Sequence, residues 1–312
     1  MRPLLLATIL FLINLNAQET AFLPGMYVSS LCCDPKMDET WAGSFDGVYF
    51  FSGDEQRGHL SGPLFAGEEN QLKVLSGGDL SSRFVTALAL DEKYCYAGTD
   101  RSLDIVDRFS RKIVKKVPTS QVTSFLRLGH YIMFGTFDGL FFLDDQLNSR
   151  PISDLKEGLA FLDQEPTGAL HFHESVRTIW IAPLRGGVIR VARNEHTKYL
   201  GNVKIRAISS YGDTTCFLAE DSLLLFNGFS WQRMRAKPFG SLPSSRVFSI
   251  LGFRDSLFIS SDTGAFRFDG VFFNPLHDEE TLEHKFVRCF ATDGHMLYMG
   301  TQRDGILSQK IQ

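Results

Sequence analysis

The chain has 312 residues, and its 32 basic and 36 acidic side chains give a formal net charge of −4. This near balance excludes a general electrostatic attraction to nucleic acid or to an anionic membrane surface. Five cysteines are present, and their odd number argues against a complete disulfide framework. We therefore expect neither a nucleic-acid partner nor a fold held together by disulfides.

Residues 1–17 are predicted to be a secretory signal peptide. A short basic start is followed by an apolar run from Leu4 to Ile13, which is too short to span a bilayer, and the segment ends at the small residue Ala17. No cysteine stands at the cleavage point, so we do not expect a lipid anchor. The mature protein, residues 18–312, should be a single domain in the periplasm or outside the cell, with no membrane insertion after cleavage.

A four-residue word organises the rest of the chain: an apolar residue, any residue, a small residue and a large apolar residue. Its copies are Val28-Ser29-Ser30-Leu31, Val85-Thr86-Ala87-Leu88, Val122-Thr123-Ser124-Phe125, Thr167-Gly168-Ala169-Leu170, Ile205-Arg206-Ala207-Ile208, Val247-Phe248-Ser249-Ile250 and Val287-Arg288-Cys289-Phe290. The first and last copies begin 259 residues apart, so the mean spacing is about 43 residues, which is typical of a β-propeller.

The small third position explains why a propeller suits this spacing. The innermost strands of propeller blades lie where neighbouring sheets are closest, so their side chains must be small to fit between the sheets. The residues at this position are Ser30, Ala87, Ser124, Ala169, Ala207, Ser249 and Cys289. We therefore predict an all-β fold, a seven-bladed β-propeller of four-stranded antiparallel blades; the alternative is a β-sandwich with coincidental similarity among its strands.

A second strand follows each word and ends in Gly-Thr or a variant of it. Gly98-Thr99 and Gly135-Thr136 are clear copies, whereas Pro183 and Glu220 replace this pattern in the fourth and fifth repeats. A third strand then opens at Gly or Ser, and Asp-Gly pairs such as Asp46-Gly47 have the chemistry of a tight hairpin turn.

Together, the word, the Gly-Thr pair and the Leu242-Pro243 that stands ahead of Val247 resemble the two-component regulator propeller repeat. The likeness covers nearly the whole mature chain and is weakest in the fourth and fifth repeats. The resemblance implies a seven-bladed propeller of the type found in the extracytoplasmic sensor regions of bacterial hybrid kinases and in some free-standing proteins.

The last repeat lacks an outer strand, because only one strand, Ile306 to Ile311, follows Gly305. Thr20-Ala21-Phe22 stands where the outer strand stands in other repeats. We predict that this N-terminal strand completes the last blade, which would leave no open sheet edge at the seam.

Two insertions interrupt the repeat, at residues 52–70 and 144–166. The first is predicted to be a mobile loop, and both are expected on the face opposite the usual ligand face, where either could dock a partner. The basic run at residues 110–117 is predicted to be an outermost strand whose lysines block pairing with other chains; the alternative is an anion-binding patch.

The familiar catalytic motifs are missing from the sequence, which has no nucleophile elbow, phosphate loop or dinucleotide fingerprint. His171 and His173 alternate onto one strand face and would need a third ligand from another blade to bind a metal. Cys32 and Cys33 could form a vicinal disulfide, although two incidental residues are the favoured interpretation. We predict no metal and no cofactor.

A propeller usually binds its ligands at the mouth of its central funnel, which is lined by the turns between second and third strands and by the connections into the innermost strands. Aromatic, arginine and carboxylate side chains there suit a polar or anionic ligand, such as a glycan or a peptide. The predicted ligand-binding residues are Phe45, Asp46, Arg83, Arg101, Phe137, Asp138, Arg185, Arg246 and Arg303.

These observations lead to three hypotheses for function. The favoured one is an extracytoplasmic, non-catalytic propeller, expected to be a monomer, that binds a small polar ligand or a protein partner as the sensor component of a signalling system. The second is a propeller lyase or hydrolase that acts on polysaccharide, with funnel acids as general acid and base. The third is an assembly scaffold that uses the outer rim or the 52–70 insertion.

Overall fold

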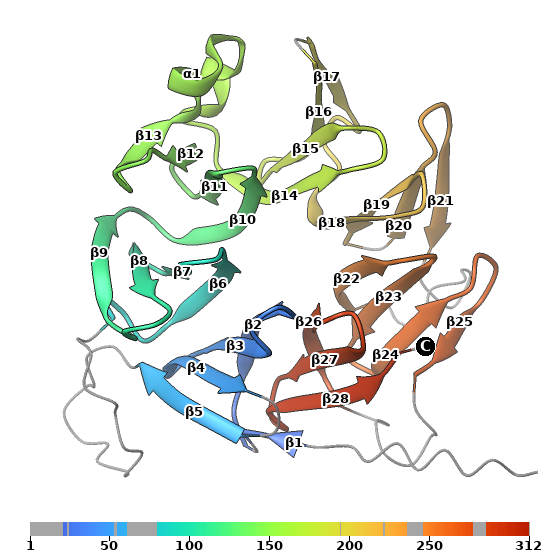
Figure 1. The fold of residues 1–312 in the computed structure, drawn as a ribbon. Helices are drawn as coiled ribbons and strands as arrows, with labels where there is room; N and C mark the ends of the chain where they lie inside the picture. The colour runs from blue at the N-terminus through green and yellow to red at the C-terminus, as the bar shows by residue number, and fades with distance from the viewer. Residues whose placement is uncertain are drawn as a thin grey trace, which may run out of the picture.

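The computed structural model describes residues 21–23, 25–52, 55–60, 80–193, 195–220, 222–235, 246–276 and 285–311, and these form a ring of seven separate sheets (Figure 1). Each sheet has four strands, and every pairing is antiparallel. The predicted seven-bladed propeller is therefore confirmed. The predicted signal peptide lies outside the described residues.

Six blades use four strands that are consecutive in the chain, and the inner strand of each comes first. Blade 1 is β2 (Val28–Asp34), β3 (Glu39–Ser44), β4 (Gly47–Ser52) and β5 (Glu55–Leu60); blade 2 is β6 (Val85–Leu90), β7 (Tyr94–Thr99), β8 (Ser102–Asp107) and β9 (Ile113–Pro118). Blade 3 is β10 (Val122–Leu128), β11 (Tyr131–Thr136), β12 (Leu140–Leu143) and β13 (Ser149–Pro151); blade 4 is β14 (Thr167–His173), β15 (Thr178–Pro183), β16 (Val188–Ala192) and β17 (Glu195–Tyr199).

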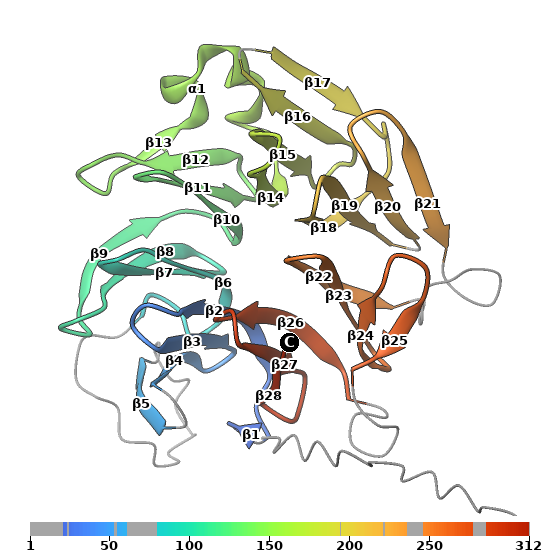
Figure 2. The ribbon, with the colours of Figure 1, turned by 45° about the vertical axis from the view of Figure 1, so that its right-hand side comes forward.

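Blade 5 is β18 (Ile205–Tyr211), β19 (Thr214–Ala219), β20 (Ser222–Phe226) and β21 (Trp231–Arg235); blade 6 is β22 (Val247–Phe253), β23 (Ser256–Ser261), β24 (Gly264–Phe268) and β25 (Phe273–Pro275). Blade 7 has β26 (Val287–Thr292), β27 (Met296–Thr301) and β28 (Ile306–Lys310), and its fourth strand is β1 (Ala21–Phe22). The outer strands β9, β17 and β21 lie on the periphery in both views (Figures 1 and 2).

The N-terminal strand closes the ring. Ala21 pairs with Leu307 and Phe22 pairs with Ile306, so both ends of the described chain lie in one sheet. This confirms the prediction that an N-terminal strand completes the last blade.

The seven inner strands contact one another in sequence around the axis, and β26 contacts β2 to complete the circle. Ser30 faces Gly43 across the first two strands of blade 1. A Cβ atom on Gly43 would lie 2.5 Å from the Ser30 Oγ and 2.6 Å from the Val85 Cγ1 of the next blade. Such distances are too short for ordinary van der Waals contact, so the glycine and the small third position together let neighbouring blades approach.

The threonine of the Gly-Thr pair stabilises the turn that follows the second strand. The Thr136 hydroxyl donates to the Gly139 carbonyl at 3.1 Å and accepts from the Asp138 N–H at 3.1 Å, which fixes the turn between the second and third strands. The residues whose hydroxyl donates in this way are Ser44, Thr99, Thr136, Ser261 and Thr301. Pro183 and Ala219 stand at this position in blades 4 and 5 and have no hydroxyl.

Blade 5 corrects one detail of the repeat alignment. The sequence pattern suggested that Ala219-Glu220 replaces Gly-Thr, but Ala207 pairs with Leu218 and Ile205 pairs with Ala219. Leu218 therefore occupies the glycine position and Ala219 the threonine position. Leu218 is fully buried in the apolar core between blades 5 and 6.

The two insertions also differ from expectation. Residues 55–60 are not loop but form β5, the outer strand of blade 1, and most of the remaining 52–70 segment lies outside the described residues. The second insertion contains α1 (Ile152–Leu155) and the 3₁₀ helix η1 (Glu157–Leu162), which continue from β13 on the outer rim.

The second insertion was expected on the face opposite the mouth, and this expectation is wrong. It runs from the lower turn of blade 3 to the mouth, because a Cβ atom on Gly139 would lie only 2.1 Å from the Asp163 carbonyl oxygen and Glu165 lies 3.6 Å from Arg185. Gly139 and Arg185 both belong to turns at the mouth. The insertion is anchored by Leu159 and Leu162, which are buried in the core between blades 3 and 4.

The basic run of blade 2 forms β9, which is the outermost strand as predicted. Lys112, Val114 and Lys116 are exposed, whereas Val117 is buried. Lysines on this sheet edge hinder pairing with a strand of another molecule.

Candidate functional site

The nine residues predicted to bind ligand all lie at one end of the ring. In an antiparallel blade, the first strand begins beside the end of the second strand, as the pairing of Val28 with Ser44 shows. The turn to the third strand follows there, since Ser44 also pairs with Gly47. The turns between second and third strands and the connections into the inner strands therefore share the mouth.

Aromatic and arginine side chains form a continuous row along part of this mouth. The row crosses blades 6, 7, 1 and 2, and we call it the mouth arc. Its members are Phe248, Arg288, Tyr27, Phe45, Phe84 and Arg83.

Three rings form the centre of the mouth arc. The Tyr27 and Phe45 rings are stacked with centroids 4.1 Å apart and an interplanar angle of 11°, and the edge of Phe84 meets Phe45 at 5.7 Å. Phe45 remains 48% exposed. Tyr27 covers one face of the Phe45 ring, and a ligand can stack against the part of the ring that remains exposed.

Arginines extend both ends of the aromatic centre. The Arg288 Cζ lies 4.2 Å from the Phe248 ring centroid and 5.5 Å from that of Tyr27, so its guanidinium joins blades 6 and 1. At the other end, the Arg83 Cζ lies 5.4 Å from the Phe84 centroid. Cation–π contacts of this kind are worth about 0.5–1 kcal/mol each at exposed sites, so they hold the arc in place before a ligand arrives.

Arg288 retains donors for a ligand. In the part of the chain that the structure describes, it forms no ion pair with a carboxylate. A planar guanidinium can bind a carboxylate or phosphate through two parallel hydrogen bonds. The mouth arc can therefore stack against a sugar or other ring while an arginine binds a polar or anionic substituent.

Two members of the mouth arc, Phe248 and Arg288, stand at the second position of the repeat word. The pairing shifts by one residue there, for example between Val28 and Ser30, so the second residue is an extra, bulged residue. In blades 1 to 3 it carries a hydroxyl that bonds the next blade: Ser29 donates to the Val85 carbonyl at 2.6 Å and Thr86 to the Val122 carbonyl at 2.6 Å.

Blades 4 to 7 carry a different set at the same position, and two of its members belong to the arc. The residues are Gly168, Arg206, Phe248 and Arg288. They do not carry the hydroxyl that links blades 1 to 3, and Phe248 and Arg288 instead meet each other across the boundary between blades 6 and 7.

The structure brings only two of the nine predicted residues, Phe45 and Arg83, into the mouth arc. The other seven lie at the mouth but are spread over several blades; they are Asp46, Arg101, Phe137, Asp138, Arg185, Arg246 and Arg303. Three of these arginines have nearby carboxylates: Arg101 lies 3.3 Å from Asp100, Arg185 lies 3.6 Å from Glu165 and Arg246 lies 3.9 Å from Asp262.

Sequence reasoning missed Tyr27, Phe84, Phe248 and Arg288. The repeat held the signal that could have found two of them, because the second position of the word varies between blades while the flanking positions stay apolar and small. A variable position at the bulge of an inner strand places a different side chain at the mouth in each blade. Tyr27 and Phe84 directly precede their words and could have been found at the ends of the connections into the inner strands.

Three described carboxylates of the funnel lie in different blades, and each has a partner. Asp46 accepts a hydrogen bond from the Tyr49 hydroxyl at 3.1 Å, Asp262 faces Arg246, and Glu220 lies 3.7 Å from Arg206. These acids thus belong to blades 1, 6 and 5 and each has a contact within its own blade. Burial raises the pKa of Tyr49, and the Asp46 carboxylate raises it further, so this phenol stays protonated.

His171 and His173 share one strand face, as predicted, with ring centroids 6.3 Å apart. His171 Nε2 lies 2.9 Å from the Ser210 Oγ, and His173 Nδ1 lies 2.8 Å from the Thr215 Oγ1. Both histidines therefore join blade 4 to blade 5 through hydroxyl groups. Among the described residues, no group of three metal-ligating side chains occurs.

The five cysteines are unpaired within the described structure. Adjacent strand positions direct the side chains of Cys32 and Cys33 to opposite faces, and Cys33 contacts the Thr40 hydroxyl at 3.4 Å. Burial raises the pKa of the Cys33 thiol to about 12, so the reactive thiolate is scarce at neutral pH. This supports the interpretation of the pair as incidental core residues.

Comparison with known proteins supports the fold. No protein-family model matches the sequence, and no curated protein matches it significantly. The extracellular domain of BT4673 from B. thetaiotaomicron, described as a hybrid two-component system, superposes with a TM-score of 0.70 at 13% identity over 95% of this chain. This chain covers only 40% of the length of that one.

Other solved propellers are nearly as similar. The WD40 repeats of RRP9 superpose with a TM-score of 0.66 at 14% identity and cover 92% of this chain and 95% of theirs. A computationally designed protein, Ika8, gives a TM-score of 0.63 at 10% identity over 93% of this chain and 98% of its own. The resemblance predicted from the repeat is confirmed at the level of the fold, since a two-component system's extracellular domain is among the similar structures.

None of the described helices is both long and apolar enough to cross a bilayer.

Proposed function

We propose that this protein is a non-catalytic, extracytoplasmic β-propeller that binds a small polar ligand, such as a glycan or a peptide, at the mouth arc. It is periplasmic or secreted and acts as a monomer. The observation that carries the proposal is the row of stacked rings and arginines that crosses four blades at one side of the mouth.

The chemistry of the arc favours a ligand that has a ring and a polar or anionic group. The exposed surface of Phe45 provides a stacking platform, and the guanidinium of Arg288 provides hydrogen-bond donors beside it. These groups are already in contact with their neighbours, so little conformational entropy is lost when a ligand binds.

The proposed location and the proposed signalling role both draw on the similar structures. Two of the similar structures are extracellular domains of BT4673, and this chain matches only about two fifths of that protein's chain. We propose that this propeller acts as the sensor component of a signalling system and passes its ligand-bound state to a separate protein partner.

The second candidate, a polysaccharide lyase or hydrolase, is less well supported. Such chemistry needs an acid and a base placed together within hydrogen-bonding reach of one substrate bond. Asp46, Asp262 and Glu220 lie in three blades, and each contacts a residue of its own blade. The third candidate, an assembly scaffold, would use the outer rim and leave ligand binding at the mouth unaffected.

A ligand screen tests the proposal directly. Neutral and acidic oligosaccharides and peptides are screened by thermal shift, and the affinity of each hit is measured by calorimetry. We expect Phe45→Ala and Arg288→Ala each to raise the Kd by about five- to thirtyfold, which corresponds to about 1–2 kcal/mol for a residue at the centre of a binding site.

Arg185→Ala is the matched control. Arg185 also lies at the mouth and is exposed, but it belongs to blade 4 and faces Glu165, outside the arc. It should leave the affinity unchanged. A hit whose affinity falls with Arg185→Ala but not with the two arc variants would contradict the proposed site.

A further inference from the structure

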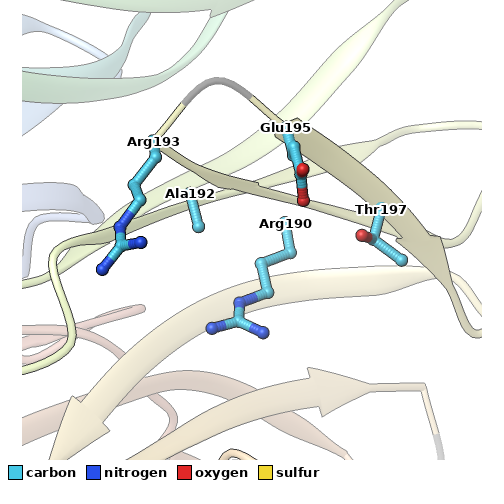
Figure 3. A pocket seen from close by; sticks show the side chains of 5 residues that line it. All are labelled: Arg190, Ala192, Arg193, Glu195 and Thr197. Atoms are coloured by element: carbon cyan, nitrogen blue, oxygen red, sulfur yellow. The ribbon is translucent and has the colours of Figure 1, made fainter.

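A cavity of about 470 Å³ lies beside the hairpin of the two outer strands of blade 4, away from the mouth arc. Its walls are formed by Arg190 and Ala192 of β16, by Arg193 in the turn, and by Glu195 and Thr197 of β17 (Figure 3). This turn joins third and fourth strands, so it lies at the end of the ring opposite the mouth.

The cavity opens on the side of blade 4 that faces blade 5. Side chains alternate along β16, so Arg190 lies on the same face as Val188, and Val188 packs in a core cluster with Phe217 and Leu224 of blade 5. The guanidinium groups of Arg190 and Arg193 point to the same side of the hairpin (Figure 3). Two positive charges thus share one hollow, whose described lining residues all belong to blade 4.

Neither arginine is neutralised within the described part of the chain. No carboxylate lies within ion-pair distance of either guanidinium, Glu195 included. The Nε of Arg190 is buried and has no hydrogen-bond partner among the described residues. An unpaired buried donor destabilises the folded protein, and an anion bound by the same guanidinium would offset this cost.

Trp180, the strand neighbour of Arg190, carries a second buried and unpaired donor. Trp180 pairs with Arg190 across β15 and β16, so both side chains lie on the face toward blade 5. The Trp180 Nε1 is buried and, like the Arg190 Nε, lacks an acceptor in the described structure. Trp180 lies in the apolar core and does not line the cavity, so of these two unpaired donors only that of Arg190 belongs to a residue of the cavity wall.

We propose that this cavity is a second binding site, specific for a small organic anion that carries hydroxyl groups. The arginines bind its carboxylate, phosphate or sulfate group through charge-assisted hydrogen bonds. The Glu195 carboxylate and the Thr197 hydroxyl accept hydrogen bonds from the hydroxyl groups of the ligand. The volume of about 470 Å³ exceeds the need of an inorganic anion and suits a molecule of monosaccharide size.

The test uses calorimetric titration of the whole mature protein with glucose 6-phosphate, glucuronate, glucose and inorganic phosphate. We expect the two sugar anions to bind more tightly than inorganic phosphate and glucose not to bind this cavity. Arg190→Leu should raise the Kd of the sugar anions by about tenfold or more, because a charged bidentate contact is lost. Arg193→Gln should raise it by a smaller factor.

A stability measurement separates this role from a merely structural one. Arg190→Leu removes a buried donor that has no partner, so the Tm of the ligand-free variant should equal or exceed that of the wild type. Glu195→Gln should strengthen the binding of inorganic phosphate by removing a like charge, and Phe45→Ala at the mouth should leave all these affinities unchanged.

Two results would overturn the proposal. One is the absence of binding of both sugar anions at millimolar concentration; the other is binding with wild-type affinity by both Arg190→Leu and Arg193→Gln. Neither result bears on the mouth arc, whose residues lie at the other end of the ring.

Discussion

The boundary between blades 1 and 2 and the boundary between blades 4 and 5 join equivalent elements with different chemistry. The first is polar. The Ser29 hydroxyl bonds the Val85 carbonyl, and at the lower end Arg108 is fully buried, where it donates to Asp34 at 2.7 Å and to Glu39 at 2.9 Å. Burial tends to raise the pKa of Glu39, but hydrogen bonds from Arg111 and Arg108 outweigh it and hold that pKa below its usual value.

The second boundary is aromatic. Trp180 of blade 4 meets the Phe217 ring edge-on at 4.8 Å and the Phe226 ring at 5.6 Å, and Trp231 lies 4.7 Å from Phe226. The hydroxyl groups that link and fix blades 1 to 3 are missing here, because Gly168 and Pro183 replace them in blade 4. At this boundary, contacts between large aromatic rings stabilise the packing where those hydroxyl hydrogen bonds are absent.

This contrast shows that the repeat determines the backbone geometry of a boundary but not the interactions that stabilise it. Every inner strand has its small third residue and a bulge beside it, so the inner strands share one local geometry. Where the bulged residue does not form a hydrogen bond to the next blade, its side chain can contribute to the mouth. Phe248 and Arg288 are examples.

The largest effect is expected at the polar boundary from Arg108→Met. The substitution removes one of the two arginines that bind the buried Glu39 carboxylate and the arginine that pairs with Asp34. Removing one member of a buried ion pair costs up to about 3–5 kcal/mol. Urea unfolding followed by fluorescence measures this loss.

The matched control is Arg127→Met, because Arg127 pairs with Glu92 at 2.7 Å while both side chains are largely exposed. A surface pair of this kind contributes less than about 1 kcal/mol. If Arg108→Met and Arg127→Met destabilise the protein equally, the boundary between blades 1 and 2 does not depend on its buried charges.

Gly43→Ala tests the close approach at the same boundary and should have a moderate effect. The new methyl group would lie 2.5 Å from the Ser30 Oγ and 2.6 Å from the Val85 Cγ1, so the blades must separate at a cost of about 1–3 kcal/mol. Gly158→Ala in η1 is the control, since a Cβ atom there meets nothing within 4 Å. Equal midpoints of unfolding for the two variants would rule out crowding as the reason for the glycine.

His171→Gln tests the aromatic boundary through its pH dependence and should have the smallest effect. Burial, reinforced by His173, lowers the pKa of His171 from 6.5 to about 4. The folded protein therefore binds this proton less tightly than the unfolded chain, so the associated stability is full above pH 6.5 and is lost as the pH falls toward 4.

Because the His171 ring is half-buried, solvent reduces the effect, and we expect wild type to lose about 1–2 kcal/mol more than His171→Gln between pH 7 and pH 4. Other groups titrate in both proteins and cancel in the difference. Parallel stability curves for the two proteins over this range would show that His171 does not sense pH.

The fold could be predicted from the sequence because its strongest signals are steric and repeat in every blade. Ser30 and its six counterparts are small for one reason, and that reason applies wherever inner strands converge. The strand Ala21–Phe22 was also predictable, since blade 7 otherwise lacks an outer strand.

The candidate site was less predictable because it depends on which side chains meet across blades. Phe45 and Arg83 were found from their places in turns, but their contact through Phe84 depends on packing that no spacing in the chain encodes. The second insertion was misplaced because α1 and η1 lie in the connection from the outer strand β13 to the inner strand β14, and such connections reach the mouth in every blade.

The pairing of Phe22 with Ile306 bears on how the molecule is made. Contacts between residues so distant in the chain carry a high loop-closure entropy and form late in folding. During synthesis or export, the first six blades can form before β28 of blade 7 is present, and β1 has no partner strand until then. Until that moment β28 presents an unpaired edge, so the nascent protein is most vulnerable to aggregation just before the circle is complete.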